Sequence, residues 1–331
     1  MQREIVKSAI NFNNPPRLPK RFTEPKYSDF NDITVLDDRG LNLLGKEEYT
    51  KDEWGCLWQT ELYGSMGNVV NRLLDNWEKL SSFKTPDPDD SLRYKKFDDE
   101  LKKTKNKYVL VFNHFLLFER MRFLIGFKEL LESFYLNPKE VEKLADIIVD
   151  FQVQVIRNLS KRYKGYLDGM WTTDDWGTQT ALFISKEMWD NIFKPRYKII
   201  VQELKEAGMD LWFHSCGKIN NIIGDLIEIG VKVINTYQPN CLGIEEIGKK
   251  YKDKICFETT IDIQGTILKG GDYIRNEAYA IVKNWSSKRG GLVITDFADD
   301  IGYRGYQEVK DPIKLNKLIY RYFNEAYEEI Y

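Results

Sequence analysis

From residue 108 onward the sequence alternates between short apolar runs and longer segments with helical periodicity, and this alternation restricts the fold more than any other feature. Six apolar runs follow one another, at about residues 108–112, 165–171, 211–217, 231–234, 254–257 and 291–295. Strands without polar alternation are buried on both faces, as in a parallel sheet covered by helices. The pattern therefore predicts an α/β protein built on a parallel sheet.

Polar side chains stand at the end of every one of these runs. They are Asn113 with His114, Asp174 with Asp175, His214 with Cys216, Asn235, Glu258 and Asp296. The loops after the strands of a (β/α)8 barrel form one catalytic face, so a single pocket could collect all of these groups. An open doubly wound sheet is the competing architecture, but no glycine-rich phosphate-binding turn follows an early strand. We expect a (β/α)8 TIM barrel over residues 1–331, as a single domain with an N-terminal extension over about residues 1–60.

His214 and Cys216 lie two positions apart at the end of the run that begins at Leu211. Residues i and i+2 of a strand face the same side, so both side chains could reach one target. Imidazole and thiolate are ligands that zinc prefers, and a bound metal would keep the cysteine deprotonated. A core histidine beside a buried free cysteine is the alternative that this spacing leaves open.

The composition excludes several classes of partner. The 49 basic and 51 acidic residues nearly cancel, and no basic patch or charge run indicates nucleic acid or an anionic membrane surface. No apolar segment reaches the roughly 20 residues that span a bilayer. Four cysteines, at 56, 216, 241 and 256, show no disulfide-framework spacing, and the N-terminus lacks a signal-peptide core. We therefore expect a cytoplasmic protein.

Five short motifs, taken together, resemble those of one known protein superfamily. They are Asp174 to Gln179, His214 to Gly217, Gln238-Pro239, Ile261 to Gln264, and Gly290 to Ile294. Through them the chain resembles the uroporphyrinogen decarboxylase superfamily, from the N-terminal segment to the C-terminal helix. The resemblance implies a (β/α)8 fold. The superfamily includes heme-pathway decarboxylases and zinc-dependent methyltransferases that act with corrinoid proteins or coenzyme M.

The N-terminal segment separates these two branches. Heme-pathway decarboxylases carry an Arg-Gln-Ala-Gly-Arg motif that grips the carboxylates of the substrate. Residues 15–22 of this chain contain only Arg17, Lys20 and Arg21 and lack that motif. Asp52 and Glu53 lie roughly where that branch has its catalytic aspartate, but without the clamp we do not expect decarboxylation of uroporphyrinogen.

The methyltransferase branch uses a His-x-Cys pair and a distant cysteine after a Gly-Gly strand. His214 and Cys216 match the pair, whereas no cysteine follows Gly290-Gly291. Zinc also accepts carboxylate oxygen, so a nearby acid could replace that cysteine. The expected metal ligands are therefore His214, Cys216, Glu258 and Asp296, with Asp175 and Asp299 as further candidates for the missing position.

The remaining candidates concern catalysis and substrate binding. Two carboxylates near one pocket could raise the pKa of one of them and give a general acid, so Asp174 and Asp175 are candidate catalytic residues. A role in ordering their loop is the alternative. The candidate substrate-binding residues are Trp176, Gln179, Asn235, Gln238, Asp262 and His114, for which loop capping or core packing is the alternative.

The resemblance implies a zinc-dependent methyltransferase that moves a methyl group between a small molecule and a corrinoid protein. The small molecule could be a methoxy, methylamine or thiol compound. A metal-free decarboxylase of a porphyrin-like or simpler carboxylic acid is one alternative, and a non-catalytic binding barrel is another. No nucleic acid or membrane partner is expected, and a homodimer is left open.

Overall fold

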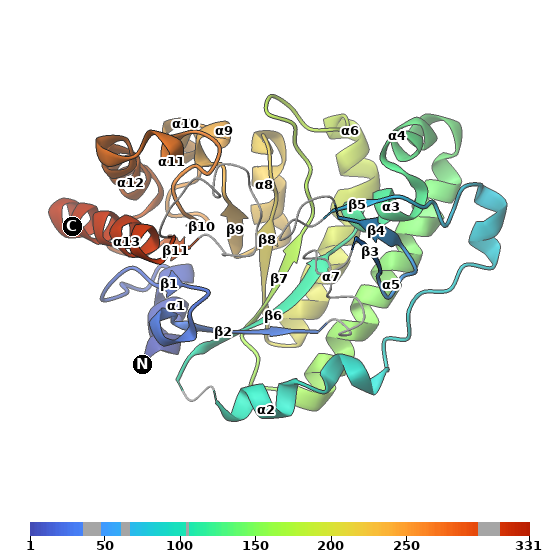
Figure 1. The fold of residues 1–331 in the computed structure, drawn as a ribbon, viewed down its shortest axis with the longest axis horizontal. Coiled ribbons are helices and arrows are strands. Elements are labelled where there is room, and N and C mark those ends of the chain that lie inside the picture. Colours follow the sequence, from blue (N-terminus) through green and yellow to red (C-terminus); the bar gives the residue numbers. More distant parts are fainter. Residues whose placement is uncertain (36–47, 61–66, 104–105, 297–311) are drawn as a thin grey trace.

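The computed structural model describes residues 1–35, 48–60, 67–103, 106–296 and 312–331, and these form an eight-stranded parallel sheet that curves into a barrel (Figure 1). In sheet order the strands are β1 (Lys20–Arg21), β11 (Leu292–Thr295), β10 (Cys256–Thr259), β9 (Val233–Thr236), β8 (Asp210–His214), β7 (Gly169–Thr173), β6 (Tyr108–Phe115) and β2 (Phe30–Thr34). The six predicted strands are all present, and the predicted (β/α)8 barrel is confirmed.

The first two strands, β1 and β2, meet where the barrel closes. The Asp29 amide donates to the Lys20 carbonyl (2.8 Å), and the Asp29 carboxylate accepts from the Lys20 amide (2.9 Å). Arg17 holds the same carboxylate with two hydrogen bonds, at 2.6 and 2.7 Å. Both strands lie within the segment expected to be an N-terminal extension, so this segment contributes directly to the barrel wall.

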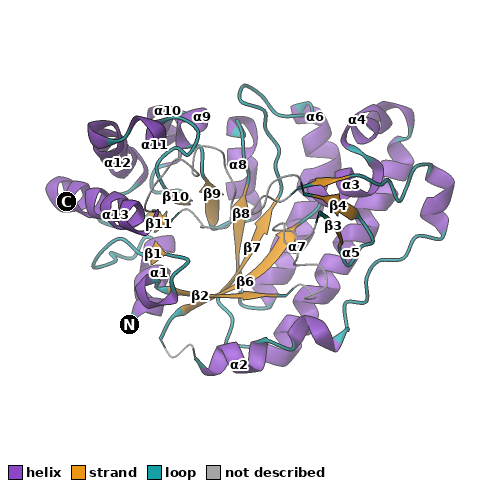
Figure 2. Cartoon of the chain, in the orientation of Figure 1, coloured by secondary structure: helices purple, strands orange, loops and turns teal. Residues whose placement is uncertain are grey.

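Helices surround the strands, as Figure 2 shows. The α-helices are α1 (Gln2–Ile10), α2 (Phe97–Lys102), α3 (Phe118–Ile125), α4 (Phe127–Leu136), α5 (Pro138–Tyr163), α6 (Lys186–Met188), α7 (Lys194–Glu206), α8 (Asn220–Ile229), α9 (Pro239–Leu242), α10 (Ile244–Tyr251), α11 (Thr266–Lys269), α12 (Gly271–Trp285) and α13 (Pro312–Ile330). Short 3₁₀ helices occupy Pro25–Tyr27, Trp77–Ser81 and Ser91–Tyr94. Within the described ranges, no helix combines the length and the apolar character needed to cross a bilayer.

Side chains on alternate strand positions fill the interior of the barrel. The inward cluster contains Tyr108, Trp212, Val233 and Cys256, and Val6 and Ile10 of α1 join it. Outward-facing neighbours such as Phe213 and Phe257 belong instead to the larger core shared with the helices. Because period-2 alternation holds along β8 to β10, His214, Asn235 and Glu258, each two residues after an inward position, also face the barrel interior.

Two helical stretches of the chain are interrupted. The helical stretch after β6 divides into α3 and α4 at Gly126, which has a φ of +110°. Ser185 caps α6 by accepting from the Met188 amide (3.1 Å). A π-helical turn, Trp189–Phe193, precedes α7, in which Pro195 occupies the first turn. The helix therefore has a wider turn just before the proline.

A small antiparallel sheet, β3 (Tyr49–Lys51), β4 (Leu57–Gln59) and β5 (Asn68–Val69), packs on α3. The Trp58 ring lies 4.7 Å from that of Phe123 in α3. The buried Asp52 carboxylate accepts hydrogen bonds from Arg120 (2.7 Å) and from the Trp58 indole (3.2 Å). The structure thus places Asp52 in the contact between this sheet and α3.

Candidate functional site

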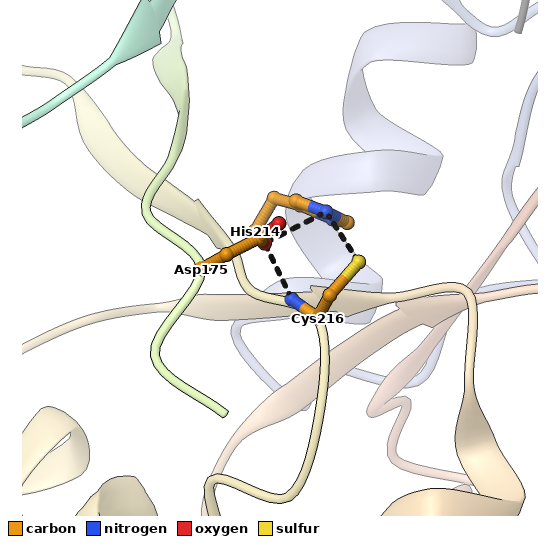
Figure 3. Close-up of side chains that lie close together, drawn as sticks. All are labelled: Asp175, His214 and Cys216. Carbon is orange, nitrogen blue, oxygen red and sulfur yellow. Dashed lines mark hydrogen bonds and ion pairs between the residues drawn. The ribbon is translucent and has the colours of Figure 1, made fainter. Parts of the chain in front are cut away.

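Three potential metal ligands come together at the C-terminal end of the barrel strands (Figure 3). His214 ends β8, Cys216 lies in the loop after it, and Asp175 lies in the loop after β7. The Cys216 Sγ is 3.5 Å from His214 Nε2, and Asp175 Oδ1 is 3.7 Å from the same nitrogen. All three ligand atoms lie within 4.8 Å of one another.

The imidazole of His214 is held in a fixed orientation. Its Nδ1 lies 2.5 Å from Asn235 Oδ1, while Asn235 Nδ2 donates to the Glu258 carbonyl (3.4 Å). Because the amide oxygen can only accept, Nδ1 carries the proton and donates it. The Trp171 ring stacks against the imidazole at a centroid distance of 5.4 Å. The lone pair of Nε2 is thereby directed toward Cys216 and Asp175.

Two glycines allow the loop that carries Asp175 and the loop that carries Cys216 to lie in close contact. A β-carbon on Gly217 would lie 2.1 Å from the Gly177 carbonyl oxygen, and one on Gly177 would lie 2.5 Å from the Lys218 amide nitrogen. The Cys216 amide also donates to Asp175 Oδ1 (2.7 Å), and the Trp176 amide donates to the Ser215 hydroxyl (3.0 Å). The close glycine contact therefore sets the distance between the carboxylate and the thiol.

Asp174, the residue before the candidate ligand Asp175, is fully buried. Its carboxylate accepts from the backbone amides of Leu117, Phe118 and Glu119 at 2.6 to 3.0 Å and from the Tyr197 hydroxyl. Burial raises the pKa of Asp174 to about 6, although these donors act in the opposite direction. The carboxylate satisfies the free amides at the start of α3, which is the arrangement expected for a loop-ordering role.

A cavity of about 350 Å³ opens beside the three ligands. Arg21, Asp32, His114, Tyr237 and Asp296 line it. The Tyr237 ring also lies 5.4 Å from the His214 ring, so the same side chain borders both the cavity and the candidate metal ligands. The cavity volume falls within the usual range of small-molecule sites.

The sequence matches the family model described as uroporphyrinogen decarboxylase (URO-D). The match covers residues 69–295, which is more than half of the chain. The chain belongs to the uroporphyrinogen decarboxylase family. This membership confirms the resemblance carried by the five sequence motifs.

Solved structures similar to this uroporphyrinogen decarboxylase family member include a methyltransferase from Methanosarcina mazei. The two share 12% identity over 98% of this chain and 99% of the other, with a TM-score of 0.68. At this identity the similarity establishes a shared fold. An L-ribulose 3-epimerase (TM-score 0.45, 12% identity, 71% of this chain and 80% of the other) and xylanase 10B from Thermotoga maritima (0.46, 12%, 99% and 99%) are also similar. The curated proteins contain no significant match.

Two donor distances measured from His214 Nε2 in this family member fit a zinc ion. Zinc bonds of about 2.3 Å to sulfur and 2.0–2.1 Å to nitrogen, at tetrahedral angles, put those two donor atoms about 3.5 Å apart. The distance between Cys216 Sγ and His214 Nε2 is 3.5 Å. For a nitrogen and a carboxylate oxygen bound to one zinc, the same reasoning gives a separation of about 3.4 Å. The distance from His214 Nε2 to Asp175 Oδ1 is 3.7 Å. One sulfur, one nitrogen and one oxygen donor leave a fourth position for a substrate atom.

The other predicted ligands lie elsewhere. Glu258 is fully buried and accepts from Arg21 Nη1 (2.6 Å), and Asp296 lines the cavity and accepts from the Thr23 amide (2.9 Å). Within the described residues, the cluster of ligand atoms contains neither of them. Asp299, the remaining candidate, lies outside the described residues.

The structure brings only some of the predicted substrate-binding residues to the cavity. His114 lines it, and Asn235 instead orients His214. Trp176 is fully buried and stacks on Phe118 at 4.3 Å, so its ring presents no surface to a ligand. The three others hold loops: Gln238 accepts from the Gly217 amide (2.8 Å), Asp262 accepts from the Gly265 amide (2.9 Å), and the exposed Gln179 donates to Gln264 (3.2 Å).

Sequence reasoning missed several residues of the site. Arg21 and Asp32 lie on β1 and β2, which are too short or too polar to show a buried-strand pattern, and Tyr237 follows the polar end of β9. Glu119 forms an ion pair with Arg122 (2.5 Å) but is buried, and its Oε2 accepts from the Thr173 hydroxyl (2.8 Å). Burial, and then the charge of Asp175, raise the pKa of Glu119 to about 8.

Proposed function

We propose that this chain is a zinc-dependent methyltransferase that moves a methyl group between a small molecule and a corrinoid protein. The observation that carries the proposal is the meeting of Asp175, His214 and Cys216 donor atoms at the mouth of the barrel. Family membership and the shared fold with a methyltransferase support it. The cytoplasm, where thiols stay reduced, is the proposed compartment.

The substrate would enter the cavity bordered by Tyr237, next to the three ligands. When bound, zinc would supply Lewis acidity at the heteroatom that carries or accepts the methyl group. The bond from the methyl carbon to the donor atom breaks with its electron pair left on the donor, and the carbon bonds to the acceptor. That acceptor is the reduced cobalt of a corrinoid in demethylation or a substrate thiolate in the opposite direction.

The chain's own residues would prepare this step. Asn235 accepts the hydrogen bond from His214 Nδ1 and so directs Nε2 toward the ligand cluster, and Trp171 fixes the plane of the ring. The locked loops keep Cys216 and Asp175 in place before a substrate arrives. Such preorganisation is how a protein lowers the reorganisation cost of a transfer reaction.

The surroundings of Arg21 count against decarboxylation of uroporphyrinogen. Its guanidinium donates to Asp32 (3.0 Å) and to Glu258 (2.6 Å), so its charge is already compensated inside the protein. A guanidinium paired in this way cannot serve as a free clamp for the carboxylates of a porphyrinogen.

Metal content tests the proposal directly. We expect about one zinc per chain in the purified protein by elemental mass spectrometry, with loss of the metal in His214→Ala, Cys216→Ser and Asp175→Asn. Cys241→Ser is the matched control, because this free cysteine lies outside the ligand cluster and should leave the zinc content unchanged. Methyl transfer to free reduced cobalamin, followed by its visible absorption, should fall in parallel with zinc.

Two outcomes would count against the proposal. A wild-type protein that takes up no zinc even on reconstitution would leave the metal-free decarboxylase or the non-catalytic binding barrel. Zinc that survives all three substitutions would move the metal to another part of the chain.

A further inference from the structure

We propose that Tyr197 is a positioning residue for the candidate metal ligand Asp175. Its hydroxyl group joins the side chains of the two residues that flank this aspartate, Asp174 and Trp176, and so fixes the carboxylate against the Cys216 amide. The inference rests on the proposed function, because it concerns the same ligand cluster. It is nevertheless a statement about the position of a carboxylate, which can be measured in the protein without a metal.

The Tyr197 hydroxyl lies between two side chains of the loop after β7. It donates to the Asp174 carboxylate and accepts from the Trp176 indole Nε1 (3.0 Å). All three side chains are fully buried. Burial, and then the charge of Asp174, raise the pKa of Tyr197 well above its usual value, so the hydroxyl keeps its proton and remains the donor. One buried hydroxyl thus connects the residue before Asp175 to the residue after it.

Aromatic side chains hold Tyr197 and the loop in contact. The Tyr197 ring lies 5.1 Å from that of Trp189 and 5.5 Å from that of Phe213 on β8. The π-helical turn Trp189–Phe193 packs its two aromatic rings on Trp176, at 5.0 and 4.5 Å. A turn of this kind is rare and often marks a functional part of a helix. The start of α7 is therefore fixed to the loop that follows β7.

The Asp175 side chain makes few contacts of its own (Figure 3). It is 29% exposed, its Oδ1 accepts from the Cys216 amide (2.7 Å), and the same oxygen lies 3.7 Å from His214 Nε2. Among the described residues, the Cys216 amide is the only hydrogen-bond donor to this carboxylate. The direction of the side chain is therefore set by the backbone on either side of it, which the buried side chains of Asp174 and Trp176 anchor.

A matched pair of variants tests this role. Tyr197→Phe removes the hydroxyl and keeps the ring. Tyr108→Phe is the control, because the hydroxyl of this fully buried residue also accepts from an indole, that of Trp212 (3.1 Å), and donates to the Asp168 carbonyl (3.0 Å). Tyr108 is the first residue of β6, at the end of the strands opposite the ligand cluster. We expect the two variants to lower the temperature of thermal unfolding by similar amounts.

Hydrogen exchange of the metal-free protein, followed by NMR spectroscopy, reports the position of Asp175. The Cys216 amide donates to its carboxylate, so this amide should exchange about tenfold faster in Tyr197→Phe and at the wild-type rate in Tyr108→Phe. The neighbouring Ser215 amide donates to a backbone carbonyl of β9 (3.3 Å) and is the internal reference. A general loss of stability would accelerate both amides, whereas a shift of the carboxylate accelerates only the first.

Cobalt(II) in place of zinc gives a second signal, because its visible absorption depends on the ligands and their geometry. We expect Tyr197→Phe to bind cobalt(II) about tenfold more weakly than the wild type, with altered d–d bands and an unchanged charge-transfer band from the Cys216 thiolate. Tyr108→Phe should match the wild type in affinity and spectrum.

Wild-type exchange of the Cys216 amide in Tyr197→Phe, or equal acceleration in both variants, would overturn the inference and leave the proposed function intact. In a protein that binds metal, an unchanged cobalt(II) spectrum and affinity in Tyr197→Phe would do the same. Should Tyr197→Phe fail to fold, Trp176→Phe removes the indole donor from the same hydroxyl and is read by the same criteria. Selective acceleration in Tyr197→Phe of a chain that binds no metal would sustain this inference while refuting the proposed function.

Discussion

One amide side chain determines which nitrogen of His214 can bind a metal. Asn235 follows a strand in the sequence and was expected to contact substrate, but the register of β8 with β9 sets it directly beside His214. It accepts the Nδ1 proton at 2.5 Å and anchors its own nitrogen on the Glu258 carbonyl. Partners of this kind fix the tautomer and orientation of metal-binding histidines.

We therefore expect Asn235→Ala to weaken zinc binding by about 10- to 100-fold without removing a ligand. Competition with a coloured chelator would measure the dissociation constant. Asn324→Ala is the control, because the Asn324 side chain donates to the Tyr320 carbonyl within α13 (2.9 Å) and lies outside the ligand cluster. Unchanged zinc affinity in Asn235→Ala would mean that Trp171 alone orients the imidazole.

We expect His114 to make the stability of the protein sensitive to acid. Burial, and then the charge of Arg120, lower its pKa from 6.5 to about 4 in the folded state. The unfolded chain therefore binds the proton first, and the stability that the neutral imidazole contributes above pH 6.5 is lost as the pH falls toward 4. By pH 5 the loss should reach about 2 kcal/mol.

His114→Gln removes this titration, so the variant should lose about 2 kcal/mol less than the wild type between pH 7 and pH 5. Urea unfolding at both pH values gives the two free energies. Parallel losses in the two proteins would show that other groups account for the acid sensitivity.

At the scale of elements, the site depends on two loops that touch through glycine. The motifs around Gly177 and Gly217 were recognisable in the sequence, but their contact is a product of the parallel pairing of β7 with β8. The sequence also indicated the polar ends of the strands, yet it could not rank Asp175 above Glu258 or Asp296. Loop geometry decides which carboxylate joins the ligand cluster. The Cys216 amide donates to Asp175, whereas Arg21 donates to Glu258.

Gly217→Ala should therefore separate the loops. Its added methyl would overlap the Gly177 carbonyl, and its φ is +79°. We expect a loss of about 1–3 kcal/mol in unfolding free energy and a loss of zinc. Gly165→Ala is the matched control, since its φ is +83° but nothing lies within 4 Å of the added carbon. Gly165→Ala should lower the unfolding free energy by about 1 kcal/mol and should retain zinc. Zinc retention in both variants would mean that the loops tolerate separation.

At the scale of the whole molecule, six barrel strands and the long helix α5 were predictable because their patterns are long and uniform. The strands β1 and β2 were not. Lys20–Arg21 is too short to show a period, and Phe30–Thr34 contains Asn31 and Asp32. Their place in the sheet follows from pairing with strands that are distant in the sequence, β1 with β11 and β2 with β6, which no local pattern reports. These two strands supply the cavity residues that the sequence did not reveal.

The pairing of β1 with β11 has a consequence for biosynthesis. Lys20 pairs with Ile294, so one wall of the barrel joins residues that are far apart in the sequence. On a ribosome that adds roughly 5–20 residues per second, β1 emerges before β11 and can pair with it only after the residues between them have been made. The Arg17–Asp29 pair connects β1 to β2 within the first 30 residues and gives the early segment a local partner during that delay. The cavity takes lining residues from β1 and from the end of β11, so it can form only after Asp296 has been made.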